Sequence, residues 1–522
     1  MYPNPNGSHI RISFLLYLWL SALLWLPSQG LGQPVNILVL LSDDHDQRAI
    51  SAYQKGLIST PNLDKIARDG VLFAQSFVTN SICAPSRAVL LTGKHSHING
   101  QKDNGRAFDG SQATLPKYFR EAGYHTALFG KWHLVSDPTG FDHWEILQGQ
   151  GQYYNPIFLT SQGKKTDSGY VSTLITAKAK KWLVHHNAEM KKPFFLMVQH
   201  KSPHRNWMPP LDLAHSRDNQ NFPLPQDFDQ IYTGPAAEQT MEIGRHMLPT
   251  GDLKIDRAVS RGLKIKGWDL PHDSGYVWNE IKRMKSSEKQ FWQKLMQQRA
   301  EDFASKLPTG KALDIWKYQW YLRDYLSCVE DLDREIGKML NLLDSLHLSE
   351  NTLVIYTSDQ GFWLGDKGWF DKRWMYETSM RTPLLLRFPG KVAKGQICSR
   401  MVQNLDITPT LLEAAQLPVP EAMQGLSFWK EITGGKAKPR EAIYYRYYEY
   451  PQPHQVRPHY GIRTTENKII YFPDLQRWEL YNLKTDPGEK NNLADLPEWK
   501  PTLEKMKTEL FHEKSRLSDN EP

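Results

Sequence analysis

The sequence predicts an α/β fold, in which a large, mostly parallel central sheet is flanked by helices and followed by a smaller antiparallel sheet. Short apolar runs are typical of buried parallel strands, and they occur at residues 35–41, 124–129, 193–199, 351–357 and 383–388. Capped or amphipathic segments between them predict helices at residues 60–70, 114–122, 170–187 and 314–343. After about residue 441 the pattern changes to short alternating and aromatic runs, which predict antiparallel strands.

The length of 522 residues predicts a large core and two domains. We expect an N-terminal catalytic domain at residues 33–435 and a C-terminal subdomain at residues 436–522, with a linker around Gly434 and Gly435. The formal net charge of +7 is modest and compatible with an anionic partner. No cluster of Lys and Arg alternates with aromatic residues, so we expect no nucleic-acid partner.

The N-terminus has the pattern of a targeting segment. Residues 12–26 form a nearly continuous apolar run, and Gly30-Leu31-Gly32 offers a small-x-small cleavage site. We therefore predict a signal peptide at residues 1–32 and an exported protein, periplasmic or secreted, or lysosomal in a eukaryote. A signal anchor is the alternative for this run. No later apolar run is long enough to span a bilayer, so no stable membrane insertion is expected after cleavage.

Residues 81–93 combine a thiol, a proline, an arginine and a short apolar helix. Pro85 suits the first turn of a helix and Gly93 suits its end. Cys83 is then expected at the helix N-terminus, where unpaired N–H groups favour an anion. Arg87, one turn further, can point back to the same place. Two interpretations remain open: a nucleophile precursor beside an anion site, or a buried structural cysteine with a surface arginine.

Acidic and amide side chains follow two of the predicted strands. Asp43 and Asp44 end the first strand, and Asp359 and Gln360 end the strand at residues 351–357. Open α/β sheets bind ligands at the carboxyl ends of their strands, and such oxygens are typical ligands of Ca²⁺ or Mg²⁺. These residues predict a site for a hard divalent cation, with helix capping as the alternative for a single Asp.

Basic side chains follow the other predicted strands. Lys131 and His133 are two residues apart and face the same side of an extended segment, while His204 and Lys372 lie in later loops. With Arg87 they offer cations for a tetrahedral anion and imidazoles for a leaving-group proton. A divalent ion with such cations is typical of phosphoryl or sulfuryl transfer. The alternative is that Lys131 and His133 are an ordinary surface lysine and a capping histidine.

The chain contains three cysteines, Cys83, Cys328 and Cys398, so no disulfide framework is implied. Cys328 falls in a predicted amphipathic helix and Cys398 in a polar loop. Either the two are inert or they pair with each other.

The motifs of the chain resemble, in order, those of the type I sulfatases, whose fold is similar to that of alkaline phosphatase. Cys83-Ala84-Pro85-Ser86-Arg87 fits the C-x-P-S-R maturation motif of that family, and Leu91-Thr92-Gly93 completes its extended form. The other matching blocks lie at residues 39–44, 130–133, 201–204, 357–361 and 481–493. The resemblance therefore covers nearly all of the mature chain.

This resemblance implies that a formylglycine-generating maturation enzyme oxidises Cys83 to formylglycine, whose hydrate is the nucleophile. The second hydroxyl of the hydrate then expels sulfate and restores the aldehyde. The implied metal is Ca²⁺, with Mg²⁺ as the alternative, and its ligands by motif position are Asp43, Asp44, Asp359, Gln360 and the modified Cys83. Gln360 stands where many relatives have Asn and keeps the carbonyl oxygen.

The resemblance also assigns the remaining charged residues. Arg87 and Lys131 are expected to stabilise the hydrate and the sulfate. Sulfate binding is expected from His133, His204 and Lys372, with His204 protonating the leaving alkoxide.

Within the family, residues 130–142 and 359–365 look like those of N-acetylglucosamine-6-sulfatases that act on heparan, keratan or mucin-type glycans. Asp366 and His459 are expected to bind sugar hydroxyls, and an ordinary surface role is the alternative for each. Three other functions remain: hydrolysis of phosphate mono- or diesters on the same scaffold, hydrolysis of another glycan sulfate or an aryl sulfate, and non-catalytic binding of sulfated glycans.

Overall fold

The computed structural model describes residues 34–230, 234–235, 240–248, 251–255, 276–436, 439–451 and 454–521, together with Met1 and Pro3. Except for those two residues, the predicted signal peptide at 1–32 lies outside the described residues. Within the described ranges, no helix combines the length and the apolar character needed to cross a membrane. The chain from Val35 to Pro522 forms one compact unit. The expected division into two domains near residue 435 stays a prediction, and the second sheet begins beyond it, at Ile443.

A ten-stranded sheet forms the centre of the unit, in the order β13-β2-β12-β9-β1-β8-β4-β5-β6-β7. Its central strands are parallel, and they are β9 (Thr352–Ser358), β1 (Asn36–Ser42), β8 (Phe194–Gln199), β4 (His125–Gly130) and β5 (His143–Leu147). Antiparallel strands extend both edges, namely β12 (Leu384–Arg387), β6 (Ile157–Thr160) and β7 (Gly163–Thr166). Beyond β12 lie β2 (Val71–Phe73) and β13 (Gln396–Cys398), which are parallel to each other. The prediction of a large, mostly parallel sheet is confirmed.

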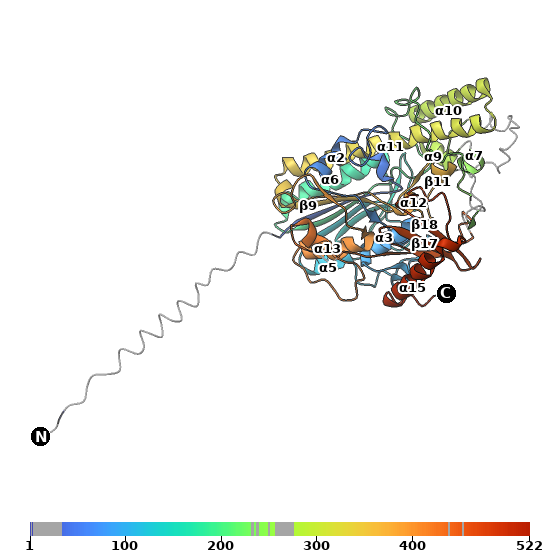
Figure 1. Cartoon of the computed structure of the whole chain (residues 1–522). Helices are drawn as coiled ribbons and strands as arrows, with labels where there is room; N and C mark the ends of the chain where they lie inside the picture. Colours follow the sequence, from blue (N-terminus) through green and yellow to red (C-terminus); the bar gives the residue numbers. More distant parts are fainter. Residues whose placement is uncertain are drawn as a thin grey trace. The chain divides into compact units, whose positions relative to one another are not determined.

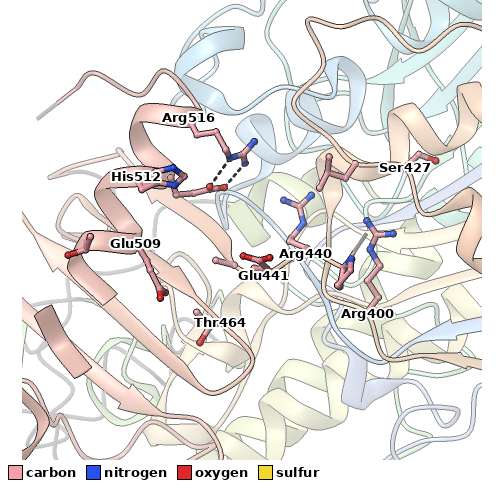
Figure 2. Close-up of a pocket in the computed structure, with 13 residues that line it drawn as sticks. Arg400, Ser427, Arg440, Glu441, Thr464, Glu509, His512 and Arg516 are labelled. Atoms are coloured by element: carbon pink, nitrogen blue, oxygen red, sulfur yellow. Dashed lines mark hydrogen bonds and ion pairs between the residues drawn. The ribbon is translucent and has the colours of Figure 1, made fainter. Parts of the chain in front are cut away.

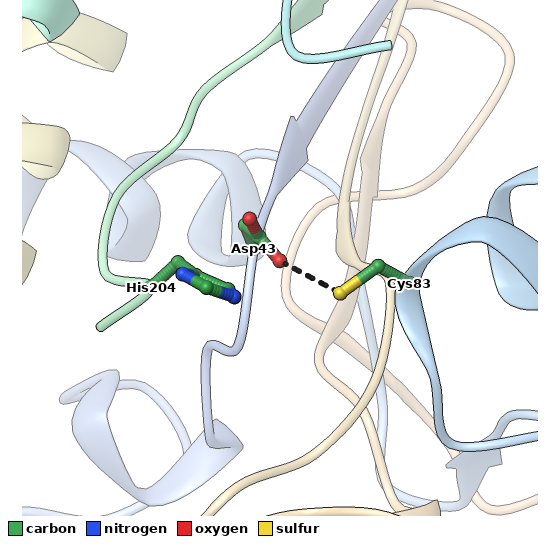
Figure 3. Close-up of side chains that lie close together, drawn as sticks. All are labelled: Asp43, Cys83 and His204. Carbon is green, nitrogen blue, oxygen red and sulfur yellow. Dashed lines mark hydrogen bonds between the residues drawn. The ribbon is translucent and has the colours of Figure 1, made fainter. Parts of the chain in front are cut away.

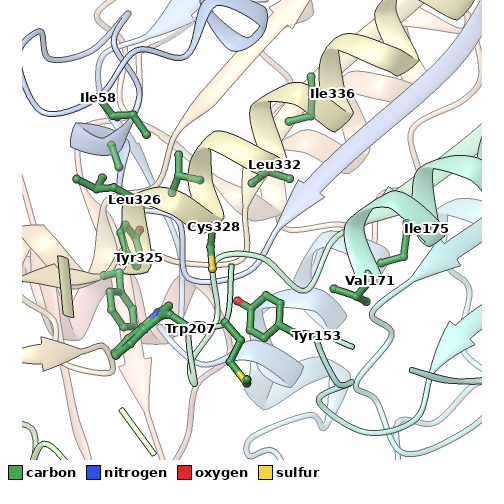
Figure 4. Close-up of a cluster of buried hydrophobic side chains, with 14 of the residues drawn as sticks. Ile58, Tyr153, Val171, Ile175, Trp207, Tyr325, Leu326, Cys328, Leu332 and Ile336 are labelled. Atoms are coloured by element: carbon green, nitrogen blue, oxygen red, sulfur yellow. The ribbon is translucent and has the colours of Figure 1, made fainter. Parts of the chain in front are cut away.

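Helices cover both faces of this sheet (Figure 1). One face carries α2 (Pro61–Arg68), α6 (Val171–Glu189) and α11 (Lys311–Ser345), and the other carries α3 (Cys83–Thr92), α5 (Leu115–Glu121) and α13 (Ile407–Ala414). Every residue of β1 is buried, because its side chains alternate between the two faces of the sheet and helices cover both faces. Leu38 and Leu40 pack in a first hydrophobic core, which lies between the sheet and α2, α6 and α11 and is shown in part in Figure 4. Ile37 and Val39 pack in a second core, between the sheet and α3, α5 and α13.

A second sheet has four antiparallel strands, β15 (Ile443–Tyr447), β16 (His459–Arg463), β17 (Asn467–Phe472) and β18 (Arg477–Asn482). The last helix, α15 (Lys500–Arg516), packs on one of its faces. Strand β15 also contacts the segment before Cys83. The Tyr445 hydroxyl accepts a hydrogen bond from Ser81 N at 3.0 Å, and Arg446 N donates to Thr79 O at 3.0 Å. The second sheet therefore supports the start of α3.

The remaining elements are short or lie in insertions. Two-stranded sheets join β3 (Ser76–Phe77) to β14 (Val402–Gln403) and β10 (Trp363–Leu364) to β11 (Phe370–Asp371). The further helices are α4 (Ser96–Asn99), α7 (Ile243–His246), α9 (Tyr276–Arg283), α10 (Ser286–Lys306), α12 (Glu377–Met380) and α14 (Trp429–Ile432). Single 3-10 turns lie at Gln47–Ala49, Ser349–Asn351, Asp366–Gly368, Asn404–Asp406 and Pro497–Trp499.

Cys83, Cys328 and Cys398 are all free and buried. Cys328 is on α11 inside the first core, and the Cys398 thiol lies 3.8 Å from a carboxylate oxygen of Glu431. A disulfide between Cys328 and Cys398 is therefore not formed, and the alternative of two unpaired cysteines holds.

Candidate active site

The site lies at the carboxyl ends of the central parallel strands. Parallel neighbours end at the same edge, so the residues that follow β1, β9, β4 and β8 converge there. Asp43 and Asp44 follow β1, Asp359 and Gln360 follow β9, and Lys131 follows β4. The N-terminus of α3 brings Cys83 to the same place, where its Sγ lies 3.6 Å from Asp43 Oδ1. Residues more than three hundred positions apart in sequence thus form one cluster.

Cys83 occupies the first turn of α3. Gly93 ends the helix with φ of 65°, a conformation that suits glycine. The side chain of Asn104 accepts a hydrogen bond from Ala84 N at 3.0 Å and so caps this end. Cys83 is only 1% exposed, and burial raises the pKa of its thiol to about 12 although Lys131 and Lys372 oppose this. The unmodified thiol is therefore protonated at neutral pH and is a poor nucleophile.

Three carboxylates meet beside Cys83. Ligand oxygens of Asp43, Asp44 and Asp359 lie within 4.8 Å of one another, and all three side chains are buried. Asp359 Oδ1 accepts a hydrogen bond from Asp44 N at 3.1 Å. Gln360 Nε2 donates to Asp44 Oδ1 at 2.5 Å, whereas the buried Gln360 Oε1 has no partner among the described residues. Crowded carboxylates with an unpaired amide oxygen fit a hard divalent cation such as Ca²⁺.

Cations surround these acids. Arg87 donates from Nε and from one terminal nitrogen to Asp359 Oδ2, at 3.1 and 2.9 Å. Lys372 Nζ donates to both oxygens of Asp44, at 2.6 and 2.7 Å, and Lys131 Nζ donates to Asp43. The ammonium of Lys131 is also 3.9 Å from Cys83 Sγ. Such fixed cations in a water-poor place stabilise negative charge on a bound anion.

The pKa shifts show how unequal the three carboxylates are. Burial and the nearby charge of Asp43 raise the pKa of Asp359 to about 7. Burial acts on Asp43 in the same direction, but Lys131, His204, Arg87 and Lys372 together hold its pKa well below the ordinary value. Burial and the charge of Asp43 also raise the pKa of Asp44, so two of the three carboxylates bear the cost of the crowding, which a bound cation would relieve.

His204 follows β8 and faces the same cluster. Figure 3 shows Asp43 between His204 and Cys83. His204 Nε2 lies 3.8 Å from Asp44 Oδ2, and Nδ1 lies 2.5 Å from the carbonyl oxygen of Arg205. A carbonyl only accepts, so Nδ1 carries the hydrogen and Nε2 is the atom that takes up or gives a proton. Burial and Lys131 lower the pKa of His204 well below its usual value.

His133 lies near this cluster without a hydrogen bond to it. Its backbone has φ of 58°, and its buried Nδ1 has no partner in the described part of the chain. Burial and Lys131 lower the pKa of His133.

Further charged residues beside the cluster were not predicted as site residues. Arg205 donates to Asp252 at 2.8 and 2.9 Å and lies 3.4 Å from Asp371, which is also bound by Arg373 at 2.6 Å. His454 Nε2 lies 3.5 Å from the same Asp371 carboxylate. Asp371 and Arg373 flank Lys372 in the sequence, which is the one signal that could have found them. Arg205 directly follows the predicted His204, so the same signal could have found it, whereas His454 lies between β15 and β16 and needed the fold.

Two predicted sugar-binding residues are placed differently from the expectation. His459 has no exposed surface, its Nε2 accepts a hydrogen bond from Met375 N at 3.1 Å, and its Nδ1 lies 2.8 Å from Arg457 O. It stacks on Trp374 in the core and has no atom free for a sugar. Asp366 pairs through both oxygens with Arg48, at 2.6 and 2.8 Å, and lines a separate cavity of about 220 Å³.

A larger cavity of about 970 Å³ lies beside α15, away from these residues. Figure 2 shows Arg400, Arg440 and Arg516 among its lining residues. Each guanidinium already pairs with a carboxylate: Arg516 with Glu513, Arg400 with Glu431 at 3.1 Å, and Arg440 with Asp406. The size of a cavity therefore does not locate the site in this protein.

The fold and the site define a hydrolase that acts on esters of tetrahedral oxyanions. The site combines carboxylates suited to a hard divalent cation, basic side chains suited to an anion, and a cysteine at the N-terminus of a helix. Comparison with known proteins identifies the family. A sulfatase family model matches residues 35–417, and a model for the C-terminal part of N-sulphoglucosamine sulphohydrolase matches residues 365–516. The chain belongs to the sulfatase family and is a sulfuric ester hydrolase.

Individual relatives support this assignment. The N-acetylglucosamine-6-O-sulfatase of Bacteroides thetaiotaomicron is 41% identical over 497 residues, covering 93% of this chain and 87% of that protein. A solved structure described as a complex with its substrate D-glucosamine-2-N,6-O-disulfate has a TM-score of 0.88 and 40% identity, covering 94% of this chain and 99% of that one. A phosphonate monoester hydrolase from Silicibacter pomeroyi has a TM-score of 0.68, covers 93% of this chain and 96% of its own, and at 18% identity shares the fold alone.

Proposed function

We propose that this sulfatase is exported and removes the 6-O-sulfate from N-substituted glucosamine in sulfated glycans, using formylglycine made from Cys83 and a bound Ca²⁺. The sequence identity of 41% to an N-acetylglucosamine-6-O-sulfatase over 93% of the chain is the observation that supports this substrate. The convergence of Cys83, three carboxylates and three cations supports the mechanism.

Cys83 is the residue to be modified. An aldehyde hydrate at this position supplies an oxygen nucleophile for sulfur and re-forms the aldehyde when sulfate leaves. The raised pKa of the unmodified thiol supports a role for the residue other than thiolate attack. Asn104 and the first turn of α3 hold the backbone of this position, so the reacting group is fixed before substrate arrives.

The metal is expected to be held by Asp43, Asp44, Asp359, Gln360 and the modified side chain at position 83. A bound Ca²⁺ supplies positive charge at the sulfate oxygens. The buried Gln360 Oε1, without a partner among the described residues, supports this arrangement. Mg²⁺ is the alternative, because the same oxygens suit both ions.

The other side chains bind and protonate. Arg87, Lys131 and Lys372 hold the sulfate oxygens, and His133, whose pKa is lowered by burial and by the charge of Lys131, assists them. His204 protonates the leaving sugar oxygen from Nε2 when its ring is doubly protonated, because the Nδ1 hydrogen is held by the Arg205 carbonyl; a bound sulfate anion favours that charged form, against the burial that lowers the pKa of His204. Arg205, Asp371 and His454 lie beside this histidine and Lys372, so they replace Asp366 and His459 as the proposed sugar-binding residues.

A substrate panel tests the proposal. Purified protein is assayed on glucosamine derivatives sulfated at position 2-N, 3-O or 6-O, on 4-O- and 6-O-sulfated galactosamine, and on a phosphate monoester. We expect turnover of 6-O-sulfated N-acetyl- or N-sulfoglucosamine with kcat/KM at least about 100-fold above the others. Preferred turnover of another position would contradict the substrate assignment and leave the sulfatase assignment intact.

The modification needs its own measurement. Mass spectrometry of the tryptic peptide containing Cys83 should show a mass about 18 Da below the cysteine form, as oxidation of the thiol to an aldehyde requires. Active protein that contains only the unmodified thiol would overturn the formylglycine mechanism.

A further inference from the structure

The loop that follows β5 brings a glutamine into contact with the proposed sulfate-binding lysine. Gln150 Oε1 accepts a hydrogen bond from Lys131 Nζ at 2.5 Å. An ammonium has only donors, so the amide oxygen of Gln150 must face it. The amide Nε2 of Gln150 then points elsewhere and finds no partner among the described residues. The side chain of Gln150 is partly exposed, unlike the buried Lys131.

Neighbouring contacts fix the loop in this position. Gly151 has φ of 73°, and a Cβ there would lie 2.6 Å from the side chain of Leu147, so the turn requires glycine. Tyr153 N donates to Glu280 at 3.1 Å, and the Tyr153 hydroxyl donates to the carbonyl oxygen of His204 at 2.6 Å. The loop is thus tied to the proposed acid at one end and to Lys131 at the other.

We propose that Gln150 is a substrate-binding residue of this site, which orients the Lys131 ammonium through Oε1 and donates from Nε2 to an oxygen of the sulfate ester. Lys131 Nζ has three hydrogens, of which Asp43 and Gln150 take two. The third faces Cys83 Sγ at 3.9 Å, the position at which the sulfate ester is expected to react, and the Gln150 amide hydrogens add donors beside it. A neutral amide suits this place because a carboxylate there would compete with sulfate for the same ammonium.

Three variants test Gln150, and the loop supplies its own control. Gln150→Glu keeps the size and adds a negative charge beside Lys131, Gln150→Ala removes the amide, and Gln148→Glu adds the same charge two residues away. We expect Gln150→Glu to lower kcat/KM by about 100-fold or more, since the new carboxylate would lie against the negatively charged sulfate oxygens and repel them. Gln150→Ala should lower kcat/KM by about tenfold, and Gln148→Glu should stay within about threefold of wild type.

This inference rests on the proposed function, so a second readout avoids the sugar altogether. Inorganic sulfate is titrated into each protein while the midpoint of thermal unfolding is followed. Ligand that binds the native state raises this midpoint, and we expect a rise for wild type and Gln148→Glu that is lost in Gln150→Glu.

The outcomes separate the two proposals. Loss of the sulfate response in Gln150→Glu, in a protein that does not act on 6-O-sulfated glucosamine, keeps the role of Gln150 and rejects the substrate. Equal effects of Gln148→Glu and Gln150→Glu, or unchanged kcat/KM and sulfate response in both Gln150 variants, overturn the role of Gln150. Mass analysis of residue 83 and unfolding midpoints without sulfate verify that each variant is folded and equally modified.

Discussion

The active site at the carboxyl ends of the central strands and the cavity beside α15 both contain arginines and carboxylates, but they arrange these charges differently. At the active site, oxygens of three carboxylates lie within 4.8 Å of one another, with a thiol and an unpaired amide oxygen among them. In the cavity each arginine pairs with a separate carboxylate, and the dashed lines in Figure 2 mark such a pair at Arg516. Crowded like charges are costly without a ligand, whereas isolated pairs are satisfied by the protein. Crowding, and not cavity size, therefore marks the functional site.

The largest effect is expected at the cysteine of the crowded site. Cys83→Ala removes the precursor of the nucleophile, so kcat should fall by about 10⁴-fold or more while the chain still folds. Cys328→Ala and Cys398→Ala are matched controls, because both thiols are also buried and free. They should retain kcat, and their cost should be seen only in thermal unfolding. Activity retained by Cys83→Ala would contradict its role.

Replacing an arginine at the active site should lower activity, whereas replacing an arginine in the cavity should lower stability. Arg87→Met removes a cation that contacts Asp359 at the site, so kcat/KM should fall by about 10²- to 10³-fold. Arg440→Met leaves the buried Asp406 without its cation and should destabilise the fold by about 3 kcal/mol or more. Its kcat/KM at a permissive temperature should match wild type. Activity and denaturant unfolding measured on both variants check this, and a loss of kcat/KM in folded Arg440→Met would place the cavity in the active site.

Metal dependence should separate Asp359 from Asp366. Asp359→Asn removes a ligand charge, so we expect the Ca²⁺ concentration for half-maximal activity to rise by about tenfold or more. Asp366→Asn alters a carboxylate that pairs with Arg48 in another cavity, and its Ca²⁺ response should be unchanged. Chelated protein is titrated with Ca²⁺ while activity and heat of binding are followed. An unaltered Ca²⁺ response in Asp359→Asn counts against its role as a ligand.

A smaller effect is expected from a carboxylate outside both regions. Burial and Glu335 raise the pKa of Asp331 to about 7. The native state therefore binds this proton more tightly than the unfolded state, and stability falls as pH rises from about 4 through 7. Asp331→Asn should be more stable than wild type at pH 8, by about 1–3 kcal/mol, with a smaller gain at pH 5. Thermal unfolding at both pH values checks this, with the exposed Asp495→Asn as the control.

Much of the architecture follows from patterns that the sequence shows directly. Strands β1, β4, β8 and β9 were predicted because each is buried on both faces and reads as a short apolar run. Strands β5, β6 and β7 were not predicted, because β5 and β6 are short and only partly buried, and β7 is polar and exposed. The segment at residues 71–78 forms two short strands, β2 and β3.

The candidate site was predictable to the extent that its residues lie in local motifs. Asp43, Asp44, Cys83 and Arg87 are found together because each motif places them directly after a strand or at the start of a helix. His459 was expected to bind sugar, but stacking on Trp374 and two hydrogen bonds place it in the core. A polar residue in a strand does not reveal which face or which depth it occupies until the strand is packed.

The sequence by itself determined the parallel sheet, the helix that starts at Cys83 and the sulfatase motifs, because strand burial, helix ends and motif spacing are local properties. Only the tertiary structure decided which charges face one another. It brought Gln360, which follows β9, to Asp44, which follows β1, and it brought Gln150 of a distant loop to Lys131. It also paired Asp366 with Arg48 through both carboxylate oxygens. The physical reason is that contacts across hundreds of residues depend on how strands order in the sheet, which no local pattern encodes.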